Sequence, residues 1–394
     1  MRYRIRPFRY LFAAMALVLA IAALMPAASA TPPGQRVLPP YVKLCLKLKR
    51  MPQHRNIRCH YPPTQRVAVG APAQALRALQ TQKTFQPPKA FQPPKALQAR
   101  KTPTISEISI PTSPATPVGI ISGPDGNLWF TENYANKIGK LTTGGLFTEY
   151  SLPTADAGPT HITVGSDGAL WFTESNANQI GKITTSGTIT EYSVPTSGAY
   201  PWGITAGPDD NLWFTELEGN KIAKLTTSGT LTEYSLPTSG AYPLRITSGP
   251  NGALWFTEAQ VGAIGQITTS GSVTEYTIPS SGAMPIGITT GSDGNLWYTD
   301  GNGKVSSVTT GGSFTEYSLS DPNSFPWGIT AGPDDNLWFV EQSANNLASV
   351  STSGTISEYA VPTSVSGPLD ITVGPDSNLW FTEDYVDKIA KAVL

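Results

Sequence analysis

One position that recurs along residues 104–394 is glycine in four repeats and a polar residue in the other three. The recurring glycine follows a variable residue at Gly119, Gly203, Gly287 and Gly328. At the equivalent places stand His161, Arg245 and Asp370, and His161 and Arg245 are the one histidine and the one arginine of this region. An imidazole can act as a base near neutral pH, next to a cation and a carboxylate that hold a ligand. We therefore take His161 as the candidate catalytic residue and Arg245 and Asp370 as candidate substrate-binding residues. The alternative is that all three only line a channel and hold water.

Aromatic residues gather at the neighbouring positions of the same pattern. Trp202 and Trp327 occupy the variable position, with Tyr200, Tyr242 and Phe325 close by. Exposed aromatic rings next to acidic groups suit stacking against sugars or against the aromatic groups of a cyclic peptide. We predict that these five residues bind substrate. The alternative is that they pack between neighbouring repeats.

Carboxylates also recur at one position. They are Glu132, Glu174, Glu216, Glu258, Asp300, Glu341 and Glu383. Oxygen ligands of this kind suit Mg²⁺ or Ca²⁺. The alternative is structural: the carboxylate repeats because the unit repeats, and it accepts hydrogen bonds from local backbone N–H groups.

The elements that must position these residues follow from a tryptophan repeat. It comprises Trp129, Trp171, Trp213, Trp255, Trp297, Trp338 and Trp380, at intervals of 42 or 41 residues. A single unit, Pro201–Tyr242, contains four short β-type segments separated by turns. Four strands in about 42 residues is typical of a β-propeller blade, whereas a β-solenoid has shorter coils. The sequence therefore predicts an all-β, seven-bladed propeller of four-stranded blades.

The last unit ends after three predicted strands. Its missing fourth strand resembles residues 104–111, where TISEISIP copies TISEYAVP of residues 355–362. We therefore expect an N-terminal strand to complete the last blade and close the ring, which removes an exposed edge. This places the propeller domain at residues 104–394.

Charge divides the chain into two parts. Charged residues are 14% of the 394, well below the roughly 25% of an average soluble protein. Residues 1–103 hold 18 Lys and Arg and no acid, so residues 104–394 hold 27 − 18 = 9 basic residues and all 28 acids, a net charge of −19. An acidic domain of this kind excludes nucleic acid as a partner. We expect a monomer.

The first thirty residues have the pattern of a secretory signal peptide. Four arginines precede an apolar stretch at residues 11–25, and an A-x-A site ends at Ala30. The apolar run is shorter than the roughly 20 residues of a spanning helix, although an uncleaved membrane anchor is the alternative. We predict an exported protein, periplasmic or secreted.

Residues 31–103 are basic and rich in Pro-Pro pairs, which predicts a disordered linker. It is either a solubilising spacer or a tether to anionic envelope polymers or to the acidic domain. In an exported chain Cys45 and Cys59 are expected to form a disulfide. His54 and His60 lie beside them, so a zinc site is the alternative.

The blade motif GPDGNLWFTE…NKIGK…TEYSLPT, which begins at Gly123, resembles the virginiamycin B lyase family, and the resemblance covers all seven repeats. It implies a seven-bladed propeller that opens cyclic ester antibiotics of the streptogramin type by elimination, with Mg²⁺ as cofactor and a role in antibiotic resistance. Mg²⁺ would polarise the ester carbonyl while a histidine removes the neighbouring carbon-bound proton.

The same resemblance assigns positions. The family's two histidines fall on Trp327 and Leu369, and one metal-binding glutamate falls on Gly367. The other, at the end of the WFTE strand, is retained as Glu383, which is therefore the candidate metal ligand. Two hypotheses follow: a metal-assisted lyase, or a non-catalytic propeller that binds a glycan, a peptide or an envelope partner through its aromatic and acidic face.

Overall fold

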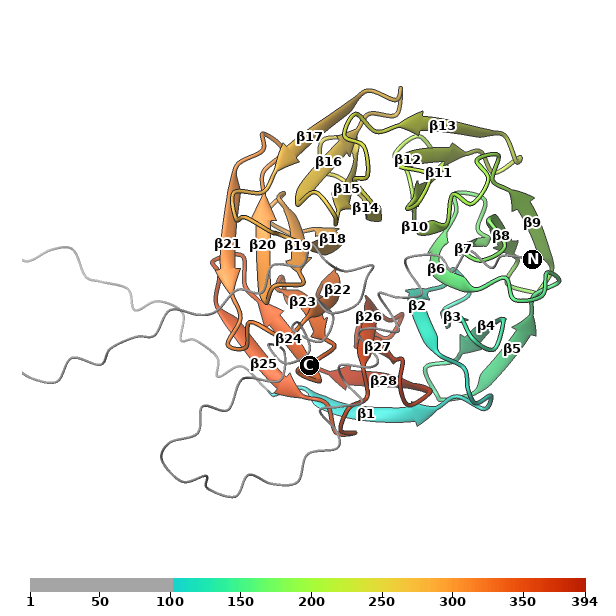
Figure 1. Cartoon of the computed structure of the whole chain (residues 1–394). Helices are drawn as coiled ribbons and strands as arrows, with labels where there is room; N and C mark the ends of the chain where they lie inside the picture. The colour runs from blue at the N-terminus through green and yellow to red at the C-terminus, as the bar shows by residue number, and fades with distance from the viewer. Residues whose placement is uncertain (1–101) are drawn as a thin grey trace, which may run out of the picture. The chain divides into compact units, whose positions relative to one another are not determined.

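A computed structural model describes residues 102–394 of the chain. The described residues form strands β1 to β28, arranged as seven antiparallel four-stranded sheets around one axis (Figure 1). This confirms the predicted seven-bladed β-propeller. The predicted signal peptide, nearly all of the linker and the Cys45–Cys59 pair lie outside the described residues. Within residues 102–394 no helix is long and apolar enough to span a membrane.

Blades 1 to 7 follow the chain order. Their innermost strands are β2 (Pro117–Ser122), β6 (Pro159–Val164), β10 (Pro201–Ala206), β14 (Pro243–Ser248), β18 (Pro285–Thr290), β22 (Pro326–Ala331) and β26 (Pro368–Val373). The second strands are β3 (Leu128–Glu132), β7 (Leu170–Glu174), β11 (Leu212–Glu216), β15 (Leu254–Glu258), β19 (Leu296–Asp300), β23 (Leu337–Glu341) and β27 (Leu379–Glu383).

The outer half of each blade is built in the same way. The third strands are β4 (Lys137–Leu141), β8 (Gln179–Ile183), β12 (Lys221–Leu225), β16 (Ala263–Ile267), β20 (Lys304–Val308), β24 (Asn346–Val350) and β28 (Lys388–Val393). The outermost strands are β5 (Phe147–Ser151), β9 (Ile189–Ser193), β13 (Leu231–Ser235), β17 (Val273–Thr277), β21 (Phe314–Ser318), β25 (Ile356–Ala360) and β1 (Thr104–Ser109).

The second strands supply the core between blades. Every residue of β3 is buried, and its alternating side chains face opposite neighbours. Trp129 packs in one cluster with Phe172 of blade 2, whereas Phe130 packs in another with Trp380 of blade 7. Repetition of this two-sided packing around the ring explains why the LWFTE segment recurs.

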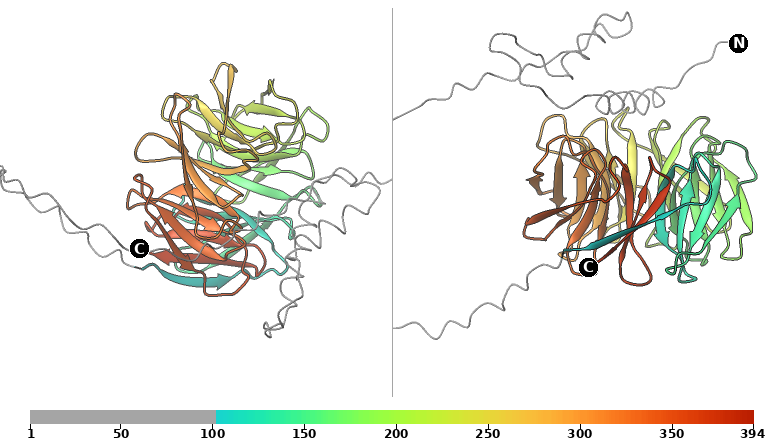
Figure 2. Two further views of the ribbon diagram at one scale, coloured as in Figure 1. Left: turned by 60° about the vertical axis from the view of Figure 1, so that its left-hand side comes forward. Right: turned by 90° about the horizontal axis from the view of Figure 1, so that it is seen from below.

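The N-terminal strand closes the ring as expected. Strand β1 pairs antiparallel with β28, from Thr104 opposite Val393 to Ser109 opposite Lys388, and it lies along the outer edge of the last blade (Figure 2). The Glu107 carboxylate of β1 accepts hydrogen bonds from Lys388 and from Thr363 of the loop after β25. These contacts tie the beginning of the domain to its end.

Glycine on the innermost strands reflects close approach of neighbouring blades. A Cβ added at Gly119 would lie 2.6 Å from the backbone oxygen of Thr160 in the next blade. A residue with a Cβ is therefore tolerated at this position only where the neighbouring backbone lies further away.

Candidate functional site

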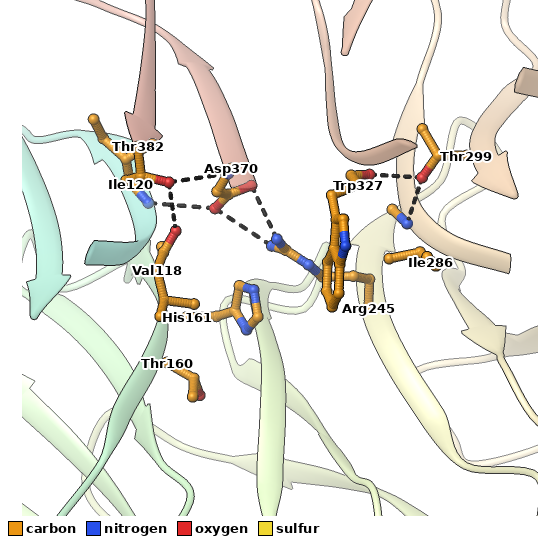
Figure 3. Close-up of polar contacts among 12 residues, drawn as sticks. Val118, Ile120, Thr160, His161, Arg245, Ile286, Thr299, Trp327, Asp370 and Thr382 are labelled. Atoms are coloured by element: carbon orange, nitrogen blue, oxygen red, sulfur yellow. Dashed lines mark hydrogen bonds and ion pairs between the residues drawn. The ribbon is translucent and has the colours of Figure 1, made fainter. Parts of the chain in front are cut away.

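Arg245 and Asp370 meet around the axis of the ring. Arg245 comes from β14 of blade 4 and Asp370 from β26 of blade 7 (Figure 3). Nη2 of Arg245 lies 3.0 Å from Oδ1 of Asp370, and Nη1 lies 3.4 Å from Oδ2. Oδ2 also accepts a hydrogen bond of 3.3 Å from the backbone N–H of Ile120 in blade 1. The side chains are 15% and 12% exposed, so this is a largely buried, two-point ion pair that links three blades.

His161 lies beside this ion pair but is closed off from solvent. It comes from β6, and its residue surface is 2% exposed. Nδ1 lies 3.0 Å from the backbone oxygen of Trp202, and a carbonyl can only accept, so Nδ1 carries the proton. Burial and then the charge of Arg245 hold the pKa of His161 well below its ordinary value, although the bond to Trp202 opposes this. His161 is thus a neutral imidazole whose Nε2 is buried and has no hydrogen-bond partner.

The aromatic residues near the axis divide into a buried and a half-buried group. Trp202 and Trp327 are only 4% and 6% exposed, so the expectation that their rings lie open for stacking is wrong. The Trp202 ring also contacts the His161 ring, with centroids 5.4 Å apart. Tyr200 stacks on Trp202 with ring centroids 6.0 Å apart, and Phe325 contacts Trp327 at the same distance. Tyr200, Phe325 and Tyr242 are half-buried, so their rings are partly exposed to solvent.

These outer rings occupy an unusual backbone conformation. Tyr200, Tyr242 and Phe325 have φ angles of 55°, 55° and 54°, in the left-handed region that favours glycine. In blades 2 and 7 the equivalent residues are Gly158 and Gly367. A bulky residue with a positive φ angle raises the conformational energy of the backbone, and such strain is typical of functional sites. The loops that precede the innermost strands are therefore a candidate binding region.

Sequence reasoning missed two exposed aromatic residues at the same end of the blades. Tyr134 and Tyr385, 71% and 44% exposed, belong to the loops after β3 and β27. The Tyr385 ring covers Gly367, because a Cβ added there would lie 2.6 Å from it. The available signal was an aromatic residue two positions after the strand's final glutamate.

The repeated glutamates point away from the axis. The end of each second strand does lie beside the start of the innermost strand, as in the pair Pro117 and Glu132. The carboxylates, however, turn toward the outer strands: a Cβ added at Gly181 of β8 would lie 2.7 Å from Oε1 of Glu174. Burial, with the charge of Glu191, raises the pKa of Glu174 to about 8.

The alternative that these glutamates accept local backbone hydrogen bonds is also wrong for most of them. The oxygens of Glu132 and Glu174 are buried without a hydrogen-bond partner. The carboxyl groups of Glu216, Glu258 and Glu383 contact side chains instead, namely Glu233, Glu275 and Glu107 of the outermost strands. Asp300 differs, since its Oδ1 accepts hydrogen bonds from the backbone N–H groups of Met284 and Asn302. Most of the set is therefore buried without a bond to a backbone N–H group.

The side chains around Glu383 do not fit a Mg²⁺ site. Burial and the charge of Glu107 raise the pKa of Glu383 to about 7, which favours a neutral acid over a metal ligand. The other metal-binding position that the resemblance assigns, Gly367, offers no side-chain ligand. No group of three or more His, Cys, Asp or Glu side chains is placed to hold a metal anywhere in residues 102–394.

Comparison with known proteins places this geometry in context. The profile of the virginiamycin B lyase family matches residues 103–392. A streptogramin B lyase structure is 42% identical, with a TM-score of 0.72, and the match covers 74% of this chain and 98% of that chain. Selenomethionine-substituted virginiamycin B lyase from Staphylococcus aureus is 41% identical, with the same TM-score and 74% and 99% coverage. A catalytically inactive histidine-to-alanine variant of the S. aureus enzyme, solved with quinupristin, is 40% identical, again with a TM-score of 0.72 and the same coverage.

Proposed function

This chain belongs to the virginiamycin B lyase family, and we propose that it binds a cyclic peptide of the streptogramin type without opening its ring. The observation that carries the proposal is that Trp327 and Leu369 stand at the two positions where the family has histidines. A relative that has lost one histidine by substitution is described as catalytically inactive, and its structure was solved with quinupristin. Binding without turnover is thus compatible with this propeller type.

Elimination requires a base that reaches a carbon-bound proton of the substrate. Indole and isobutyl side chains cannot accept that proton at neutral pH. His161 has a free lone pair on Nε2, but the protein covers this atom. Glu383 faces the outer strands rather than the axis, next to Glu107 and Lys388. Each candidate base is therefore of the wrong type or in the wrong place.

The half-buried and exposed aromatic residues support ligand binding. Tyr200, Tyr242 and Phe325 stand at the start of the innermost strands, and Tyr385 and Tyr134 lie on loops at the same end. Aromatic pairs contribute about 0.5–1.5 kcal/mol each beyond the burial of area. Several such contacts would hold a macrocycle that carries aromatic groups, and sugar rings are the second ligand class that they suit.

Catalysis is the competing function, and the 40–42% identity to lyases over nearly their full length favours it. Incubation of the purified protein with a type B streptogramin and Mg²⁺ distinguishes the two. Elimination yields a linear isomer of unchanged mass with a new retention time, whereas hydrolysis adds one water. We expect neither product, together with saturable binding by isothermal titration calorimetry.

Binding variants make the test specific to this surface. Tyr200→Ala and Tyr385→Ala should each weaken the affinity about 3- to 10-fold. Leu146→Ala is the control, because Leu146 is 74% exposed on the loop between β4 and β5 at the other end of blade 1. A linear product that disappears in His161→Ala would show that the protein is an enzyme and would reject the proposal.

A further inference from the structure

Asparagine is followed directly by glycine twice in the chain, at Asn251-Gly252 and at Asn302-Gly303. In such a pair the backbone nitrogen of the glycine can attack the side-chain amide, because glycine has no Cβ to hinder the approach or to restrict the backbone. The first pair lies in the turn between β14 and β15, and the second lies in the loop between β19 and β20. The surroundings of the two pairs differ in ways that bear on this reaction.

Asn251 lies on an open turn, and its amide nitrogen is unrestrained. Asn251 and Gly252 are both exposed, and a Cβ added at Gly252 would have no atom within 4 Å. Oδ1 of Asn251 accepts hydrogen bonds of 3.0 Å from Nε1 of Trp255 and 3.4 Å from the backbone N–H of Ala253. Nδ2, the nitrogen that would leave, has no hydrogen-bond acceptor among residues 102–394.

The hydrogen bonds of this turn are compatible with the attack. The Gly252 N–H donates a bond of 3.3 Å to the backbone oxygen of Gly249, which is long for a hydrogen bond of this type, so little is lost when the proton is removed. When the nitrogen adds to Cγ of Asn251, negative charge develops on Oδ1. The two N–H groups that already donate to Oδ1 stabilise that charge.

Asn302 is held against the same reaction. Its Nδ2 donates hydrogen bonds of 2.8 Å to the backbone oxygen of Gly282 and 3.1 Å to Oδ1 of Asp300. Gly303 is buried, and a Cβ added there would lie 2.5 Å from Cα of Pro322. Loss of the Asn302 amide nitrogen would therefore break both hydrogen bonds, in a loop whose glycine is closely packed.

We propose that Asn251 is a site of spontaneous covalent modification in the folded protein, and that Asn302 is not. The Gly252 nitrogen loses its proton to hydroxide and forms a bond to Cγ of Asn251. The Cγ–Nδ2 bond then breaks, and Nδ2 takes a proton from water and leaves as ammonia. A second step adds water to either carbonyl of the cyclic imide, which yields aspartate or isoaspartate. The net reaction consumes a water molecule and releases ammonia, without an oxidant or a reductant.

The fold can accept aspartate at this turn, because the other six blades already have it there. Each of these aspartates accepts a hydrogen bond of 2.9–3.1 Å from Nε1 of its tryptophan: Asp125, Asp167, Asp209, Asp293, Asp334 and Asp376. In four of the six a lysine pairs with the carboxylate, whereas blade 4 has Gln266 opposite Trp255. The aspartate product thus keeps the bond to Trp255 and adds a carboxylate without a lysine beside it.

Isoaspartate would have a different effect. It inserts the Cβ of residue 251 into the main chain, which lengthens the turn and disrupts the bond of 2.8 Å from the Gly249 N–H to the Ala253 oxygen. The turn follows the end of β14, whereas Tyr242 directly precedes its beginning. The modification is therefore remote from the aromatic residues and does not depend on the proposed ligand binding.

The test incubates the purified full chain at mildly alkaline pH for several weeks, folded and in guanidinium chloride. Digestion with a glutamyl endopeptidase separates the two sites into peptides 234–258 and 276–316, and mass spectrometry measures the conversion of each. In guanidinium chloride the two sites should react at similar rates, because neither retains its folded surroundings. In the folded protein Asn251 should react about 10-fold faster than Asn302, whose amide must give up two hydrogen bonds.

Asn251→Asp supplies the authentic aspartate product. It should have the retention time of one of the new species and keep the Tm of the unaltered protein, whereas the isoaspartate fraction should unfold at a lower temperature. Equal rates at the two sites of the folded protein, or a faster reaction at Asn302, would overturn the proposal. An Asn251 peptide that converts only in guanidinium chloride would do the same. A much lower Tm of Asn251→Asp would show that the turn does not accept aspartate.

Discussion

Arg245 and Asp370 form a two-point ion pair between blades 4 and 7, with 3.0 Å between Nη2 and Oδ1. The two residues are 125 positions apart in the chain. The equivalent position is glycine in four other blades and His161 in blade 2. The pair therefore joins two blades that are not neighbours, whereas neighbouring blades meet here through contacts such as the bond from Oγ1 of Thr131 to the backbone oxygen of Thr160.

Removal of one partner of this pair should destabilise the ring. Asp370→Leu leaves the Arg245 charge largely buried, and Arg245→Leu does the same to Asp370, so each should lower the free energy of unfolding by about 3 kcal/mol. The double variant should lose much less than the sum, because no charge stays unpaired. Urea unfolding of the four proteins measures the coupling, and additive losses would show that the contact contributes nothing.

The buried glutamates predict a loss of stability at alkaline pH. Glu174 has a folded pKa of about 8, caused by burial and then by Glu191, against an ordinary value of 4.5. A raised folded pKa gives stability that is complete below pH 4.5 and is lost as the pH rises to about 8. Glu174→Gln should therefore match the unaltered protein at pH 4 and exceed it by roughly 2–4 kcal/mol at pH 9.

Thermal or urea unfolding across this pH range checks that dependence. The control is Asp156→Asn, which changes an exposed carboxylate. An equal effect of both substitutions, or an advantage of Glu174→Gln at pH 4, would contradict the assignment.

His161 should not titrate in the ordinary range. Burial and then the charge of Arg245 lower the pKa of its ring, and they outweigh the Nδ1–H bond to the Trp202 oxygen, which opposes them. Nitrogen-15 spectra should show a protonated Nδ1 and an unprotonated Nε2 from pH 8 down to pH 5, with the signal identified by its loss in His161→Gln. A midpoint near pH 6.5 would mean that the ring is exposed and available as a base.

Restoring the family's histidines should not be enough to create a lyase. Trp327→His with Leu369→His supplies imidazoles, but the third change, Gly367→Glu, meets the Tyr385 ring, 2.6 Å from the new Cβ, in a backbone with φ of 65°. We expect streptogramin opening only when Tyr385→Ala is added to the three substitutions. Chromatography of the linear product compares the triple and quadruple variants, and full activity in the triple variant would show that Tyr385 is no obstacle.

The blade number, the four strands per blade and the closing strand could be predicted from the 42-residue repeat. Each copy of the repeat contains the strand and turn residues of one blade, so the number of copies gives the number of blades. The direction of the glutamates could also have been predicted. In LWFTE the period-2 alternation puts Glu132 on the same face as Leu128 and Phe130, which pack between blades rather than toward the axis.

Contacts across the ring could not be predicted in this way. Arg245 and Asp370 occupy equivalent positions in different repeats, and periodicity assigns them a level along the axis but no partner. The burial of Trp202 was equally hidden, because a tryptophan at a variable position is compatible with a binding surface and with packing. The Tyr385 ring covers Gly367 because of the geometry of its loop, which the repeat does not specify.

Strand β1 is among the first parts of the propeller to be synthesised, yet its partner β28 is the last. While the ribosome produces blades 1 to 6, β1 has no hydrogen-bonding neighbour, and blade 7 cannot form. Closure of the ring must therefore wait until β28 has been synthesised. Until then the growing chain stays in an open form, with unpaired strand edges that a chaperone could recognise.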